Sequence, residues 1–208
     1  MHTINIPRQS GFTLIELLVT ITILSILLAV GIPTMGKWMS ASRAMTVAEF
    51  YVEGLKLARA EAVKRNVVSR FSLIENSTNG QYDWRVDICV PTPAAQCNAD
   101  GGNWSTTTTA GTGAGVGDFL SVARSSIALP KSNLVALTIG DAGADQVYFT
   151  PVGWVDATIA PTLKQITVAP AAGREGDFPK SAVKLTLAGA VFKCNPTITT
   201  MSDSRACP

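Results

Sequence analysis

Residues 11–33 read GFTLIELLVTITILSILLAVGIP, an almost unbroken run of apolar side chains. A helix from Phe12 to Ile32 would be about 30 Å long, which matches the hydrocarbon core of a bilayer. Glu16 is the only ionisable side chain in this run. The summed apolar side chains outweigh the roughly 3 kcal/mol that one carboxylate costs, so we expect membrane insertion and regard Glu16 as a functional candidate. Four hydroxyl groups can bond back to helix carbonyls in lipid: those of Thr13, Thr20, Thr22 and Ser25.

A short polar segment, MHTINIPRQSG, occupies residues 1–11 and ends in a small residue before the apolar run. A secretory signal has the opposite order, because its cleavage site follows the apolar core. A cut after Gly11 would remove the leader, keep the helix and create an amino group on Phe12. That cation would lie four residues from Glu16, and the two charges attract strongly where the dielectric is low.

This stretch resembles the class III signal of type IV pilins and of the pseudopilins of type II secretion. The resemblance implies that a prepilin peptidase cuts between Gly11 and Phe12 and then methylates Phe12. It implies that Glu16 pairs with the N-terminal amine of a neighbouring subunit during assembly. It also implies that Pro33 permits a kink, and that the partners are other minor and major pilins or pseudopilins and the inner membrane.

Apolar residues continue at three- and four-residue intervals after Pro33, which predicts an amphipathic helix packed on a domain. They are Val47, Phe50, Tyr51, Leu55, Ala58 and Ala62. The expected organisation is therefore a leader (1–11), a transmembrane and assembly helix (12–33), its amphipathic continuation (34–66) and a β-rich domain (67–208).

Short alternating runs after residue 66 predict strands, the first two being 67–74 and 84–90 around a turn-rich connector. Further candidates lie within 119–129, 133–139, 146–151, 164–170, 182–188 and 190–194, with a hairpin around 187–190. The glycine-rich stretch 100–118 is expected to be a surface loop or flexible insertion. The predicted fold class is α+β, with one long N-terminal helix packed on an antiparallel sheet, as in type IV pilins.

Four cysteines fall into two local pairs, Cys89 with Cys97 and Cys194 with Cys207. An even count behind a membrane-targeting segment favours disulfides and a periplasmic domain. Three pairings are possible; sequential pairing is the prediction, because each pair then closes a short polar loop. Reduced buried thiols and a zinc site are the alternatives, and neither pair has the Cys-x-x-Cys spacing typical of zinc.

The segment 58–73, ARAEAVKRNVVSRFSL, resembles the part of the GspH/FimT family of minor pilins that leads into the first strand. The terminal pair of cysteines is similar to the disulfide-closed last loop of minor pilins in this group. The resemblance implies a non-enzymatic minor pilin that helps initiate or cap a type IV pilus. The alternatives are the minor pseudopilin GspH of type II secretion and a pilus-borne DNA receptor for natural transformation.

The only histidine is His2, in the expected leader, so a mature chain would lack a Ser-His-Asp triad and any histidine metal site. We therefore predict no enzyme activity, no cofactor and no metal, with Asp83 and Asp87 on a solvated strand face. The formal charge of +2 gives little support for a nucleic-acid partner. A weak DNA contact through Arg174, Lys180 and Arg205 is the residual alternative. The expected location is the inner membrane, with the N-terminus cytoplasmic and the domain in the periplasm, and then the pilus or pseudopilus.

Overall fold

The structure, a computed structural model, describes residues 11–113, 115–141, 143–200 and 202–207, and within them the side chains at 30, 33 and 34 lie outside the description. The chain divides into two compact units, Met1–Met39 and Ser40–Pro208. The first contains the beginning of the helix, and the second contains the rest of the helix and all the strands.

Helix α1 (Leu14–Arg65) is the single long helix of the described chain. It continues through position 33, which confirms that Pro33 does not end it; the kink expected there stays a prediction. The helix ends where Asn66 takes a left-handed conformation with φ of 55°, and the Val67 amide then donates to the Ala62 carbonyl at 3.1 Å. An asparagine in this conformation is a common helix stop, and the basic residues of the last turn suit the negative end of the helix dipole.

The second half of α1 buries the stripe that its sequence predicted. Val47, Tyr51, Ala58 and Ala62 are completely buried, and Phe50 and Leu55 nearly so. The amphipathic pattern is therefore confirmed as the packing face of the helix on the domain.

Eight strands follow among the described residues, and they form two antiparallel sheets of four where we expected one. They are β1 (Val68–Asn76), β2 (Gln81–Cys89), β3 (Val122–Arg124), β4 (Val135–Ile139), β5 (Gln146–Phe149), β6 (Gln165–Pro170), β7 (Ser181–Leu185) and β8 (Val191–Cys194). The orders are β3-β2-β1-β5 and β4-β6-β7-β8. Alternation locates strands but leaves their edge pairing open, which is why the division was missed; the α+β class itself is confirmed.

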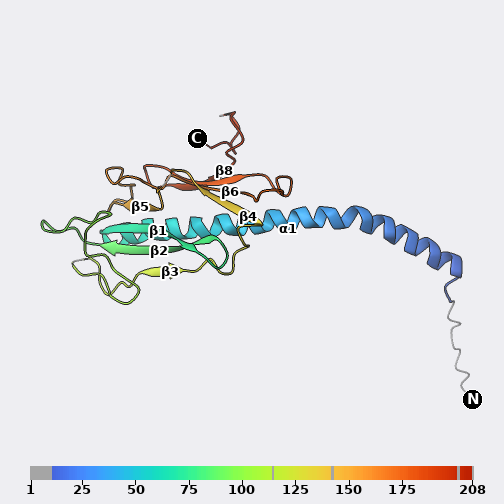
Figure 1. Cartoon of the computed structure of the whole chain (residues 1–208), viewed down its shortest axis with the longest axis horizontal. Helices are drawn as coiled ribbons and strands as arrows, with labels where there is room; N and C mark the ends of the chain where they lie inside the picture. The colour runs from blue at the N-terminus through green and yellow to red at the C-terminus, as the bar shows by residue number, and fades with distance from the viewer. Residues whose placement is uncertain (1–10, 114, 142, 201, 208) are drawn as a thin grey trace, which may run out of the picture. The chain divides into compact units, whose positions relative to one another are not determined.

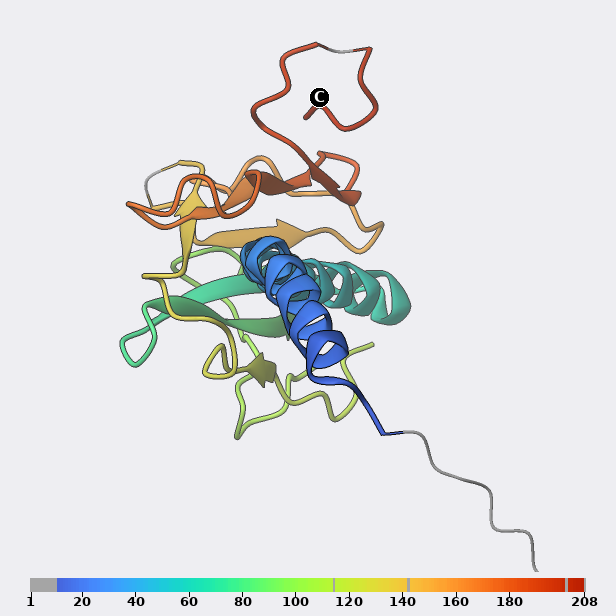
Figure 2. The same cartoon turned by 90° about the vertical axis from the view of Figure 1, so that its right-hand side faces the viewer.

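One core joins α1 to both sheets. Phe71 and Trp84 of the first sheet and Ile166 and Val183 of the second belong to the same buried cluster as Tyr51 of the helix. Figure 1 shows β1 and β2 alongside the second part of α1, with β6 and β8 in a separate layer. Figure 2 shows the same two layers along the helix and the loop that follows β8 standing off its sheet.

The glycine-rich stretch is a loop, as expected, but part of it is anchored. Val116 and Phe119 form a second small core with Val67 and Ile88. Arg65 donates from Nη1 to the Val116 carbonyl at 2.6 Å, which fixes the loop on the end of α1.

Candidate functional site

The start of α1 is a reciprocal cap between Thr13 and Glu16. The Glu16 amide donates to Thr13 Oγ1 at 3.3 Å, and the Thr13 amide donates to Glu16 Oε2 at 3.4 Å. This arrangement is a capping box, in which two unpaired donors of the helix start are satisfied at once. A carboxylate in the first turn also interacts favourably with the positive end of the helix dipole. The Thr13 hydroxyl therefore caps the helix, where we had expected it to bond to a helix carbonyl.

The cap turns the Glu16 carboxylate back toward the beginning of the chain. Phe12 immediately precedes the capping residue, so the nitrogen that cleavage after Gly11 would convert to an amine lies one residue before the cap. Gly11, Phe12 and Glu16 are all exposed in the described chain. The arrangement thus leaves a carboxylate accessible to a cation at the start of the helix.

The surface of the first helical unit is largely apolar. Large side chains such as Phe12, Leu14, Ile26 and Leu27 are exposed by more than half. The remaining hydroxyls do bond to helix carbonyls, Thr20 to Leu17 and Thr22 to Val19 at 2.8 Å and Ser25 to Ile21 at 2.7 Å. Among the residues that the structure describes, no helix is both long enough and apolar enough to cross a membrane. The rest of the expected leader, residues 1–10, and the side chain of Pro33 lie outside the described residues.

Both expected disulfides are present, Cys89–Cys97 and Cys194–Cys207. The first closes the segment after β2, and the second closes the last loop of the chain, where Asn195 and Ala206 also form a β-bridge. Neither contributes a free thiol, since the described structure has no free cysteine.

Two of the three residues considered for DNA contact form ion pairs with neighbouring carboxylates. Arg174 donates from Nε to Asp177 at 2.8 Å, and Arg205 forms a 2.8 Å ion pair with Asp203. The Arg205 guanidinium lowers the pKa of Asp203 to about 2, so this carboxylate stays charged beside it. Lys180 is exposed. These pairings reduce the positive charge available to phosphates at this end of the domain.

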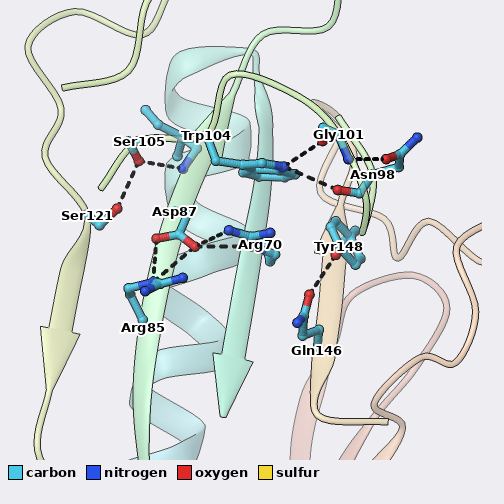
Figure 3. Close-up of polar contacts among 11 residues, drawn as sticks. Arg70, Arg85, Asp87, Asn98, Gly101, Trp104, Ser105, Ser121, Gln146 and Tyr148 are labelled. Atoms are coloured by element: carbon cyan, nitrogen blue, oxygen red, sulfur yellow. Dashed lines mark hydrogen bonds and ion pairs between the residues drawn. The ribbon is translucent and has the colours of Figure 1, made fainter. Parts of the chain in front are cut away.

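A buried charge cluster on β1 and β2 was not expected (Figure 3). Asp87 is completely buried, and Arg70 donates to its Oδ2 from Nη2 at 2.7 Å and from Nε at 3.1 Å. Arg85 approaches the same carboxylate, with Nε 2.9 Å from Oδ1. The solvated strand face predicted for Asp87 is therefore wrong, because two guanidinium groups make its burial possible.

The signal that would have found this pair is the hairpin register. Asn76 pairs with Gln81 across the turn, and the same register places Arg70 opposite Asp87. Opposite charges that face each other on adjacent strands stabilise the pairing.

Asp83, on the same strand, is half-buried and structural as well. Burial alone would raise its pKa, but hydrogen bonds from Asn76 Nδ2 and from the amide and hydroxyl of Ser126 outweigh burial and lower the pKa. The Ser126 amide is 2.6 Å from Asp83 Oδ1. This carboxylate therefore ties the segment after β3 to β2.

Trp104 covers the charge cluster from the disulfide-closed side. Its ring lies 4.3 Å from the Arg70 guanidinium carbon and 5.7 Å from the Tyr148 ring centre. Its Nε1 donates to the carbonyls of Asn98 and Gly101 at 3.2 and 3.0 Å. Trp84 is buried in the core and Trp104 is half-buried in its loop, whereas Trp154 is exposed. The cluster offers no unpaired nucleophile, so we regard it as structural.

No group of three or more potential ligand side chains that could hold a metal occurs among the described residues.

Comparison with protein families agrees with this arrangement. Residues 6–32 match the model of the prokaryotic N-terminal methylation motif, and residues 48–189 match that of the type II transport protein GspH. No curated protein and no solved structure matches the chain significantly. Because the second match covers more than half of the chain, the protein belongs to the GspH family, within the type IV pilin and pseudopilin superfamily.

Proposed function

We propose that this chain is a minor pilin that helps to initiate or cap a type IV pilus. Its apolar helix would anchor the precursor in the inner membrane, with the N-terminus cytoplasmic and the domain periplasmic, and would then join the filament. The observation that supports this most directly is the capped carboxylate of Glu16 at the start of an otherwise apolar, exposed helix surface. A carboxylate retained in such a surface needs a cationic partner, and processed Phe12 of a neighbour supplies one.

The two disulfides favour an oxidising compartment for the domain, which agrees with a periplasmic location. Processing is proposed to occur between Gly11 and Phe12, followed by methylation of Phe12. The second candidate function is that of a minor pseudopilin of type II secretion. It is supported by the match to the family of the type II transport protein GspH. The genes beside this one would separate the two, since pilus and secretion-channel components differ.

The test compares processing with assembly in a strain that lacks the native gene. Replacing Gly11 by leucine should leave a larger, unprocessed species on a gel. Glu16→Ala should be processed to an N-methylated Phe12, detectable by mass spectrometry of the mature N-terminus, yet should be depleted from sheared filaments. Glu75→Ala, which removes an exposed carboxylate from the domain, is the matched control and should assemble normally.

A second pair of variants separates the charge of Glu16 from its capping role. Glu16→Gln keeps an oxygen that can accept from Thr13 but carries no charge, so the cap survives and the ion pair does not. Thr13→Val removes the capping hydroxyl and keeps the charge. We expect Glu16→Gln to assemble as poorly as Glu16→Ala and Thr13→Val to assemble better. Normal filament incorporation of Glu16→Gln would exclude the ion-pair role.

DNA binding is the weakest of the three functions, because Arg174 and Arg205 already have carboxylate partners. A gel-shift with DNA tests it directly. Absence of salt-sensitive retardation at micromolar protein would exclude it.

A further inference from the structure

An apolar cavity of about 480 Å³ lies in the domain between the segment after β5 and the end of β7. Its apolar lining includes Val155, Pro161, Leu163, Leu185 and Leu187. Leu163 and Leu185 are buried in the main core, whereas Leu187 is largely exposed. The cavity is therefore open at the surface over a floor that belongs to the folded core.

Two similar turns continue this apolar surface beyond the cavity. They are Thr150–Trp154, with the sequence TPVGW, and Thr186–Ala190, with the sequence TLAGA. In each, the first threonine amide donates to the carbonyl of the fifth residue, and the glycine amide donates back to the threonine carbonyl. The turns present Val152, Trp154 and Leu187 with 62–69% of each residue exposed.

The turns are held in place by the helix and by each other. Arg59 donates from Nε to the Gly153 carbonyl at 3.1 Å, and the Val155 amide donates to the Leu187 carbonyl at 2.9 Å. Gly189 has a positive φ of 75°, and a Cβ there would collide with the Gly153 carbonyl oxygen. The exposed apolar side chains are thus carried by a preformed surface, which lowers the entropic cost of binding a partner.

The charge around the cavity is positive. Lys164 and Lys184 both line it, together with one carboxylate, Asp141. Asp141 lies 3.4 Å from the Lys164 amine in an exposed pair, and Lys184 pairs with no carboxylate within the described residues. Two amines against one carboxylate favour an occupant that brings a negative charge of its own.

The extent of the surface indicates the size of the occupant. A small amphiphile could fill the cavity, but it would leave Val152 and Trp154 in water on the neighbouring turn. Exposed aromatic and apolar side chains beside a pocket are typical of protein interfaces, where such residues supply most of the binding energy. We propose that the cavity and the two turns bind an apolar, carboxylate-bearing segment of a different subunit of the same filament. This proposal rests on the filament role proposed above.

The test places a photo-crosslinking amino acid at position 187 of the full-length chain in the producing bacterium. Ile127, an apolar residue exposed by 56% elsewhere in the domain, is the matched control position. We expect position 187 to give about tenfold more adduct than position 127, with a pilin-type subunit other than this chain. Mass spectrometry should place the cross-link in a peptide that contains an aspartate or glutamate.

Charge reversal tests the role of the lysines. Lys184→Glu should lower the adduct yield at position 187 about tenfold, whereas Lys180→Glu, outside the cavity, should leave it unchanged. Protease resistance and intact disulfides serve as the check that each variant is folded, and Lys164→Glu replaces Lys184→Glu if the latter is not.

Equal yields at positions 187 and 127, adducts with a second copy of this chain, or adducts with lipid alone would each overturn the proposal. Suppose that Glu16→Gln blocks assembly, and that the chain with native Glu16 gives no subunit adduct from position 187. The docking site then fails while the filament role stands. If Glu16→Gln assembles normally, the filament role fails independently of the cross-links.

Discussion

Arg70 on β1 lies directly opposite Asp87 on β2, with its Nη2 atom 2.7 Å from the Asp87 carboxylate and Trp104 stacked on its other side. Asp87 lies two residues before Cys89, the residue at which β2 ends and the disulfide-closed segment begins. Asp87 is completely buried, and the guanidinium groups of Arg70 and Arg85 balance its charge.

Removing the carboxylate of this pair should be costly. Asp87→Ala leaves two guanidinium groups without their partner, and we expect the free energy of unfolding to fall by about 3–5 kcal/mol. Asp141→Ala is the control, because its pair with Lys164 is exposed and should contribute about 0–1 kcal/mol. Urea denaturation of the full chain in detergent micelles measures both. Equal losses would show that burial does not decide the strength of the Asp87 interactions.

Acid should destabilise the domain partly through Asp83. Its hydrogen bonds hold the folded pKa below the value of about 3.9 for an unfolded aspartate. The stabilisation is therefore fully present above about pH 4 and is lost as the pH falls through the folded pKa, because the unfolded chain then binds more protons. Asp83→Asn should flatten this decline in urea midpoints, and Ser126→Ala should move it to higher pH. An unchanged profile in both variants would contradict the assignment.

Gly189 should be intolerant of any side chain. Gly189→Ala would put a Cβ against the Gly153 carbonyl at a positive φ, and a loss of about 1–3 kcal/mol in unfolding free energy is expected. Gly176→Ala is a matched control, since nothing lies within 4 Å of its added Cβ. Its effect should stay within about 0.5 kcal/mol. A similar stability for both variants would show that the two turns can move apart.

The two disulfides should stabilise the domain in the opposite order to the one that loop length predicts. The chain-entropy model makes the larger loop, closed by Cys194–Cys207, slightly more stabilising, at about 3 kcal/mol. The Cys89–Cys97 bridge also holds the segment that carries Trp104 over Arg70. We therefore expect the double serine variant of Cys89 and Cys97 to lower the thermal midpoint further than that of Cys194 and Cys207. The opposite order would mean that the Trp104 contacts survive without the bridge.

Local patterns predicted the elements of this protein well. The periodicity of Val47, Tyr51 and Ala58 identified the packing face of α1, and alternation located all eight strands. The nearest-neighbour pairing of the cysteines was also sufficient to find both bridges. These features depend on short stretches of sequence, whose physical preferences act over a few residues.

What was missed depends on contacts between distant stretches. Asp87 looked like a surface residue because its two arginines had not been placed, and the pairing of β4 with β6 follows from no local pattern. Thr13 was expected to bond within the helix, although its spacing from Glu16 is that of a capping box. That last relationship was available in the sequence and could have been predicted.

The join between α1 and β1 has a mechanical consequence. Two residues separate the end of α1 at Arg65 from the start of β1 at Val68, and β1 is hydrogen-bonded along both sides, to β2 and to β5. A tensile force applied along α1 is therefore delivered to a strand whose withdrawal must shear two ladders together. Arg65 adds one more bond at this junction, because its guanidinium donates to the Val116 carbonyl of the glycine-rich loop at 2.6 Å.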